Sequence, residues 1–169
     1  MPLFPLSPQF STPFTNCALK KYRLALAATY SYTQFNGGTK ATALAAEVTA
    51  VNRINGIYET DAGVTMQLIS NNVDVICDYA GCPTTPVGAQ PYTSGNAAAL
   101  LSENQIDTDL IIGSANYDLG HVLDAFAGNP NGLAALSSVC NASEKASATS
   151  ISPSPHHWSG QSNLSKCGA

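Results

Sequence analysis

Histidines are the natural place to look for metal chemistry in this sequence. The 169 residues hold three of them, His121, His156 and His157, and none lies four residues from another. A zinc site of the H-E-x-x-H type needs that spacing on a helix, with a glutamate after the first histidine. Adjacent side chains of an extended chain point to opposite sides, so His156 and His157 are poorly placed to chelate an ion. We expect His121 to be structural, and we expect no metal site in this chain.

Carboxylates and nucleophiles offer no clearer catalytic pattern. Four aspartates are spread over an expected helix and an expected strand, and we expect them to be solvated surface groups; they are Asp107, Asp109, Asp118 and Asp124. The sequence has no G-x-S-x-G elbow, no P-loop and no G-x-G-x-x-G turn. Acyl transfer by a serine elbow and nucleotide binding by these loops are therefore not indicated.

The five cysteines bear on the redox compartment. Cys77 and Cys82 flank a four-residue stretch in which Gly81 permits a turn, so they could close a small disulfide loop. The alternative is five free cysteines in a reducing compartment. We favour the disulfide because the composition, rich in small residues and poor in charge, is typical of extracellular proteins. We therefore expect an extracellular or cell-surface location, although residues 1–16 lack the basic start and apolar run of a signal peptide.

Charge and length limit the class of protein. Charged residues make up 11% of the chain, hydrophobic residues 44%, and the net charge is −4. An acidic balance argues against a nucleic-acid partner, and there is no polybasic stretch for a membrane surface. The length fits one domain. We expect an extended Pro-rich leader over residues 1–18, an α/β domain over 19–152 and an irregular tail over 153–169.

The first half of that domain carries a strand–helix–strand pattern. Residues 21–35 alternate apolar and polar side chains and indicate a strand. Apolar residues then recur at helical spacing over Thr39–Tyr58, with Thr39 as the N-cap. Residues 64–69 indicate a second strand. Two strands joined by a helix of this length are expected to be parallel.

The second half predicts one helix and three strands. Residues 71–101 are expected to be irregular apart from a short strand at 73–77. Ser102 and Gln105 have the spacing of a capping box, so a helix is expected to begin there and to end near residues 113–116. The expected strands are Leu119–Phe126, Leu133–Cys140 and Ala146–Ile151. The fold class is α/β, with a mixed, mostly parallel sheet of about five strands and two main helices.

Several short motifs, in this order and at this spacing, make the chain resemble the bacterial reprolysin-like zinc metallopeptidases of the metzincin clan. The most specific is Tyr117-Asp118-Leu119-Gly120-His121-Val122. The motifs lie at residues 21–29, 52–59, 112–122, 132–134, 139–141 and 152–155. The resemblance implies the upper subdomain of such an enzyme, which hydrolyses peptide bonds with zinc-activated water.

The family's zinc-binding motif, H-E-x-x-H-x-x-G-x-x-H, is missing from these 169 residues. In the family it follows a segment like Ser152–Pro155, but here the likeness stops at Pro155. We hypothesise a truncated catalytic domain whose tail arises from a frame shift after that codon; genuine divergence is the alternative. Zinc is the cofactor that the resemblance implies, and none is expected for this chain, which is expected to be inactive alone.

The resemblance also implies a binding edge for a peptide or protein substrate. In the family an extended peptide pairs with the edge strand that contains Gly-Leu-Ala. The matching residues are Gly132, Leu133, Ala134, Ala135 and Leu136. A plain edge strand without a ligand is the alternative for these residues. For the chain as a whole, the alternatives are a non-catalytic module that binds peptides or proteins with this strand, and a secreted α/β domain whose likeness to metzincins is uninformative about its role.

Overall fold

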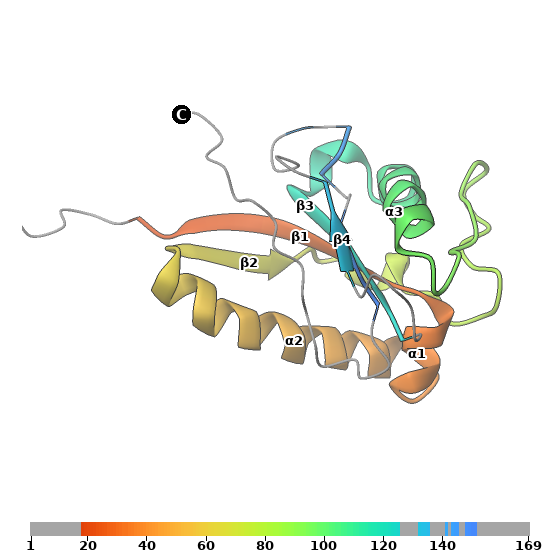
Figure 1. Ribbon diagram of the computed structural model, residues 1–169, viewed down its shortest axis with the longest axis horizontal. Coiled ribbons are helices and arrows are strands. Elements are labelled where there is room, and N and C mark those ends of the chain that lie inside the picture. Colours follow the sequence, from red (N-terminus) through yellow and green to blue (C-terminus); the bar gives the residue numbers. More distant parts are fainter. Residues whose placement is uncertain (1–17, 126–131, 136–140, 142, 146–147, 152–169) are drawn as a thin grey trace, which may run out of the picture.

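A computed structural model describes residues 18–125, 132–135, 141, 143–145 and 148–151 (Figure 1). The expected leader and tail lie outside these residues, apart from Ala18. The described part is built on one sheet with strand order β2-β1-β3-β5-β4. Its strands are β1 (Lys20–Ala28), β2 (Val64–Leu68), β3 (Leu119–Asp124), β4 (Gly132–Ala134) and β5 (Ala148–Ile151). All neighbouring strands are parallel except β4, which runs antiparallel to β5. The expected mixed, mostly parallel α/β sheet is confirmed.

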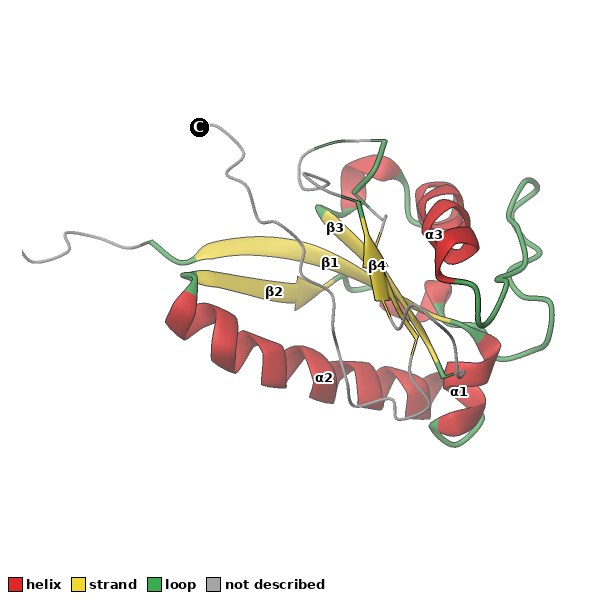
Figure 2. Cartoon of the chain, viewed as in Figure 1, coloured by secondary structure: helices red, strands yellow, loops and turns green. Residues whose placement is uncertain are grey.

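Helices cover both faces of the sheet (Figure 2). The long helix α2 (Lys40–Asp61) packs on one face and α3 (Ala97–Ile111) on the other. A short helix α1 (Tyr30–Phe35) joins β1 to α2. Two 3-10 turns, η1 (Asn72–Val75) and η2 (Ser114–Asn116), lie in the connections.

Strand β1 shows how the alternation of its side chains builds both cores. Leu24 and Leu26 face α2, where they pack in one apolar cluster with Val51 and Met66. Ala25 and Ala27 face α3, and Leu100 belongs to the cluster on that side. Successive strand residues point to opposite faces, and a central strand covered on both faces is apolar throughout.

The edge of β1 beyond the end of β2 is completed by an amide side chain. Asn72 accepts a hydrogen bond from the Leu26 N–H at 2.8 Å and donates to the Leu26 carbonyl at 2.9 Å. It also donates to Oε2 of the buried Glu47 at 2.8 Å. The amide therefore takes the place of one residue of a neighbouring strand, which satisfies backbone groups that would otherwise be buried without partners.

The expected helix boundaries are partly wrong. The strand predicted over residues 21–35 ends at Ala28, because Thr29 accepts a hydrogen bond from the Tyr32 N–H and caps α1. The predicted N-cap Thr39 is confirmed, and it forms a capping box with Thr42. Helix α3 begins at Ala97, capped by Asn96, rather than at Ser102.

The expected strands are found with shifted bounds. The strand expected at residues 73–77 is a 3-10 turn followed by a single bridge between Ile76 and Ala28. Strand β3 ends at Asp124, and the expected strands of residues 133–140 and 146–151 correspond to β4 and β5. Residues 136–140 lie outside the described part of the chain.

Candidate functional site

The sheet ends on one side at β2, and this edge is covered by a side chain of α2. The Asn55 amide accepts a hydrogen bond from the Met66 N–H at 2.9 Å and donates to the Met66 carbonyl at 2.8 Å. These are the outward-facing groups that another strand would use. An incoming strand therefore has to displace Asn55 before it can pair with β2.

The other edge of the sheet is β4. Among the described residues β4 pairs with β5 alone, with Leu133 opposite Thr149. Backbone groups of an antiparallel strand point alternately to its two sides, so part of the N–H and C=O groups of β4 point away from β5. Nothing in the described residues occupies that side in the way that Asn55 occupies the edge of β2.

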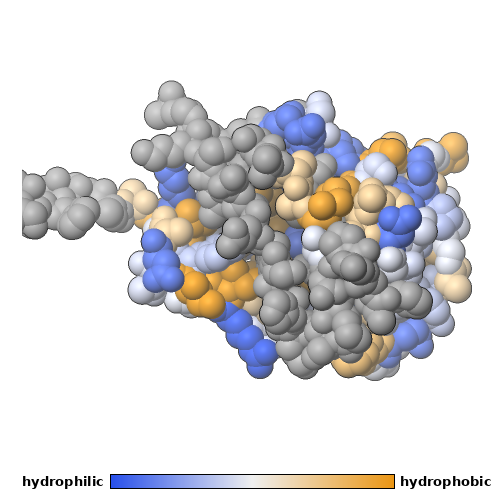
Figure 3. Space-filling model, in the orientation of Figure 1, coloured by the Kyte–Doolittle hydropathy of each residue, from blue (hydrophilic) through white to orange (hydrophobic). Residues whose placement is uncertain are grey.

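The side chains at the β4 edge are mostly small among the described residues. Gly132 and Ala134 are small and half-buried, as is Ala135 just after the strand. Leu133 is 37% exposed, and it is the large apolar side chain of this edge. The structure thus brings four of the five expected binding residues to one sheet edge, while Leu136 lies outside the described residues. Figure 3 shows apolar patches among polar side chains on the part of this face that the structure describes.

The described residues contain no group of three His, Cys, Asp or Glu side chains that could hold a metal ion. His121 lies in the centre of β3 and is 2% exposed. Burial lowers the pKa of this imidazole to about 3, so it is neutral at physiological pH. The expected structural role fits this position. His156 and His157 lie outside the described part of the chain.

The expectation of solvated surface aspartates is wrong for Asp107 and Asp124, whereas Asp109 and Asp118 are partly exposed and each have a defined partner. Asp107 and Asp124 are almost completely buried. Asp109 accepts hydrogen bonds from the Tyr117 hydroxyl at 2.8 Å and from Gln105. Asp118 forms an ion pair with Arg23 at 2.7 Å, and the hydrogen bond from that guanidinium lowers the pKa of the carboxyl.

A fifth acidic residue, Glu103, was not expected to matter and lies beside Asp107 on α3. Its carboxylate accepts hydrogen bonds from the N–H and the hydroxyl of Thr93, at 2.8 and 2.6 Å. The available signal was the spacing of Glu103 and Asp107, which puts them one turn apart on one helix face with the buried Leu100.

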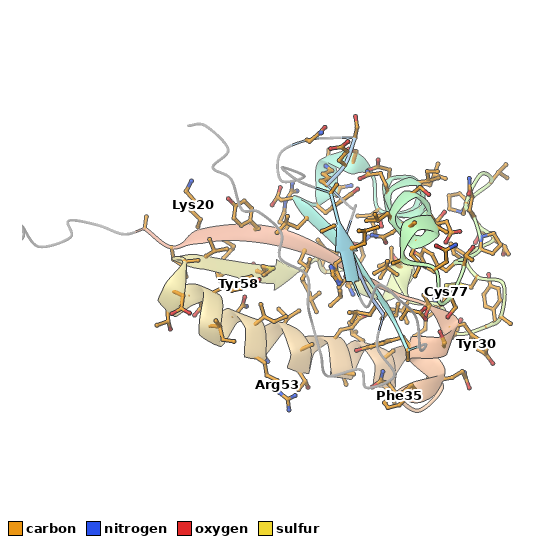
Figure 4. The ribbon with its side chains drawn as sticks, in the orientation of Figure 1. Lys20, Tyr30, Phe35, Arg53, Tyr58 and Cys77 are labelled. Atoms are coloured by element: carbon orange, nitrogen blue, oxygen red, sulfur yellow. A yellow bond between two sulfur atoms is a disulfide. The ribbon has the colours of Figure 1, made fainter. Side chains whose placement is uncertain are left out.

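The predicted disulfide between Cys77 and Cys82 is confirmed. It closes the loop that follows η1, and the Cys77 N–H donates to the Ala28 carbonyl at the end of β1. Figure 4 shows Cys77 and Tyr30 toward the same end of the sheet, with Lys20 at the opposite end of β1. Within the described residues, no helix combines the length and the apolarity that a bilayer crossing requires.

Comparison with known protein families shows which family this chain belongs to. A family model described as Metallo-peptidase family M12B, Reprolysin-like, matches residues 44–162. The match covers more than half of the chain and includes most of α2, all of α3 and the strands from β2 to β5. No curated protein matches the chain.

Proposed function

Since the chain belongs to the reprolysin-like metallopeptidases of family M12B, we propose that its sheet binds an extended peptide or protein segment along β4. The binding residues are Gly132, Leu133, Ala134, Ala135 and Leu136. The backbone of the bound segment pairs with the outer side of β4, and Leu133 supplies an apolar contact.

The observation that carries this proposal is the difference between the two sheet edges. The β2 edge is occupied by the Asn55 amide, with two hydrogen bonds to Met66. The β4 edge has no such cover among the described residues, and its side chains are mostly small. Strand addition therefore costs no displaced hydrogen bond at β4, whereas at β2 it costs two.

The zinc chemistry of the family does not fit the residues of this chain. The 169 residues contain no H-E-x-x-H segment. Residues 18–125 and the described parts that follow bring no three metal-ligating side chains together. His121 is enclosed in the sheet. We infer that this polypeptide alone binds peptides without hydrolysing them, because the segment that holds zinc in the family is not found in its 169 residues.

An extracellular or cell-surface location goes with this function. Disulfides persist in oxidising compartments and are rare in the cytosol. The Cys77–Cys82 bond is the observation that supports this location.

Proline substitutions in β4 test the binding edge. The probe is a fluorescein-labelled ten-residue peptide of alternating valine and threonine, and its fluorescence anisotropy measures binding to the purified chain. Leu133→Pro and Ala134→Pro each remove one N–H group, and alternation places one of these on the outer side and the other toward β5. The variant that keeps the wild-type melting temperature is the outer one, and we expect it to weaken binding at least tenfold.

Leu133→Ala is the matched control, because it keeps every backbone donor and loses only the apolar contact. It should weaken binding less than the outer proline. Equal binding by wild type and both proline variants excludes β4 as the acceptor. Mass spectrometry of the probe, with and without added zinc, tests the second half of the proposal. Cleavage that a chelator abolishes would show that the chain is a working peptidase.

A further inference from the structure

The segment that leads into α3, residues 90–95, is held in place by three buried carboxylates. Asp107 of α3 accepts a hydrogen bond from the Gln90 N–H at 2.8 Å. Glu103, one turn earlier, accepts from the Thr93 N–H at 2.8 Å. Asp124 at the end of β3 accepts from the Gly95 N–H at 2.7 Å. Three backbone N–H groups of this one segment thus each donate a hydrogen bond to a different carboxylate.

The environment of these carboxylates contains no balancing positive charge within the described residues. Arg23 pairs with Asp118, and Lys145 donates to the carbonyl oxygens of Ser114 and Tyr117. Asp107 is 0% exposed. A carboxylate that is buried without a cation is stable only when neutral or well supplied with hydrogen bonds.

Asp107 lacks that supply of hydrogen bonds. Its Oδ1 accepts from Gln90, but its Oδ2 is buried without a partner in the described structure. The hydroxyl of Tyr92, which lies in the same segment, is also buried without a partner there. An ionised oxygen enclosed in this way has to be hydrated by opening the segment, whereas a proton on Oδ2 removes the charge with the segment closed.

We propose that Asp107 is a proton-operated latch for residues 90–95: a proton on its carboxyl keeps the segment closed against α3, and loss of that proton loosens it. The ionisable groups that face Asp107 are Glu103 on α3 and Tyr92 on the segment. Asp124, on β3, holds the far end of the segment. None of these groups carries a positive charge that would keep the ionised form closed.

The pKa of Asp107 determines the pH range over which the segment should open. Burial raises the pKa of its carboxyl to about 6, the hydrogen bond from Gln90 opposes this rise, and the charge of Glu103 adds to it. When the segment is open, the pKa of the Asp107 carboxyl returns toward its ordinary value of 3.8. Opening therefore becomes more favourable as the pH rises from about 4 to 6 and changes little above that range. The pKa of Asp107 differs by about 2 between the closed and the open segment. This corresponds to an increase of about 100-fold in the equilibrium constant for opening.

Hydrogen exchange of the whole chain, followed by NMR at single amides, tests the latch. After correction for intrinsic exchange rates, protection of the Gln90 amide should fall about 100-fold between pH 4 and pH 7.5. Asp107→Asn keeps an acceptor for Gln90 and cannot ionise, so its protection should stay nearly constant. Asp109→Asn removes a charge from the same helix without touching the segment, and it should retain the wild-type response. The amide of Leu26 in β1 reports global opening and should not follow the pattern.

Two results would overturn the latch. The first is a pH response of the Gln90 amide that persists in Asp107→Asn. The second is an Asp107 carboxyl carbon whose chemical shift titrates below pH 4.5, because the carboxyl would then be ionised with the segment closed. The second measurement needs no variant, so it stands even when a substitution disturbs folding.

Discussion

Replacing Asn72 by leucine should destabilise the domain by about 4 kcal/mol. Asn72 is 2% exposed and makes three buried hydrogen bonds, two to the backbone of Leu26 and one to Glu47. Leucine has a similar volume, so the change removes the bonds with little loss of packing. It leaves an N–H, a carbonyl and a carboxyl buried without partners, and each such group costs about 1–3 kcal/mol. Two of these groups at about 2 kcal/mol each account for the expected loss of about 4 kcal/mol. We expect the third group to be partly hydrated and to add little.

Urea unfolding followed by circular dichroism at 222 nm measures this loss. The expected loss approaches the total stability of a typical domain, about 5–15 kcal/mol, so the measurement should be made at low temperature. Asn71→Leu is the control, because that neighbouring side chain is exposed and makes no capping hydrogen bond. It should change stability by less than about 0.5 kcal/mol.

A second substitution separates the loss of the Asn72 hydrogen bond to Glu47 from the loss of its two hydrogen bonds to the Leu26 backbone. Burial raises the pKa of Glu47 well above its ordinary value, and the hydrogen bond from Asn72 is the contact that opposes this rise. Glu47→Leu added to Asn72→Leu should therefore restore about 1–2 kcal/mol by removing a group that has lost its partner. A loss below about 1 kcal/mol for Asn72→Leu would refute the reasoning, since the Leu26 groups would then be satisfied in some other way.

Three further changes probe other parts of the fold. Replacing Cys77 and Cys82 by serine should cost about 2 kcal/mol, from the loop-closure entropy of a six-residue ring, and calorimetry with and without the substitutions measures it. His121→Gln should make the domain less sensitive to acid: the neutral imidazole stabilises the fold above pH 6.5, and this contribution is lost as the pH falls toward 3. At pH 4 the difference between variant and wild type, relative to pH 7, should be about 3 kcal/mol by urea unfolding. Asn55→Ala should expose the β2 edge and produce concentration-dependent association in sedimentation velocity, whereas Asn52→Ala on the same helix should not.

Local patterns in the sequence predicted the parts of the fold that depend on local physics. The helical spacing after Thr39, with a threonine able to cap it, predicted α2 and its start. The strand–helix–strand order predicted that β1 and β2 are parallel. The Cys77–Cys82 loop was short enough for the bond to be foreseen. In each case the partner groups lie within about twenty residues or belong to one supersecondary unit.

The errors arose where short-range signals competed or where distant segments meet. Tyrosine and threonine favour strands, so residues 30–35 were assigned to one, although Thr29 could have been read as a cap. The Ser102–Gln105 spacing masked the stronger start at Asn96, which precedes three alanines. The burial of Asp107 depends on residues 90–95 folding across α3, and nothing in the local sequence encodes that contact. The β4 edge was expected from the family likeness, whereas the cover on β2 was not foreseen.

The Asn55 amide, which is bonded to Met66 of β2, leaves the described sheet with one uncovered edge, β4. With both edges open, each copy of a sheet can accept one neighbour and offer itself to another, so pairing continues without limit into a fibre. With Asn55 on Met66 of β2, β4 is the more open edge among the described residues, and a twofold pair of copies formed through β4 uses that edge on each side. Such a pair leaves no uncovered sheet edge among the described residues at which a third copy would add without displacing Asn55. A single asparagine on a helix thereby protects one edge of the sheet from acting as a template for polymerisation.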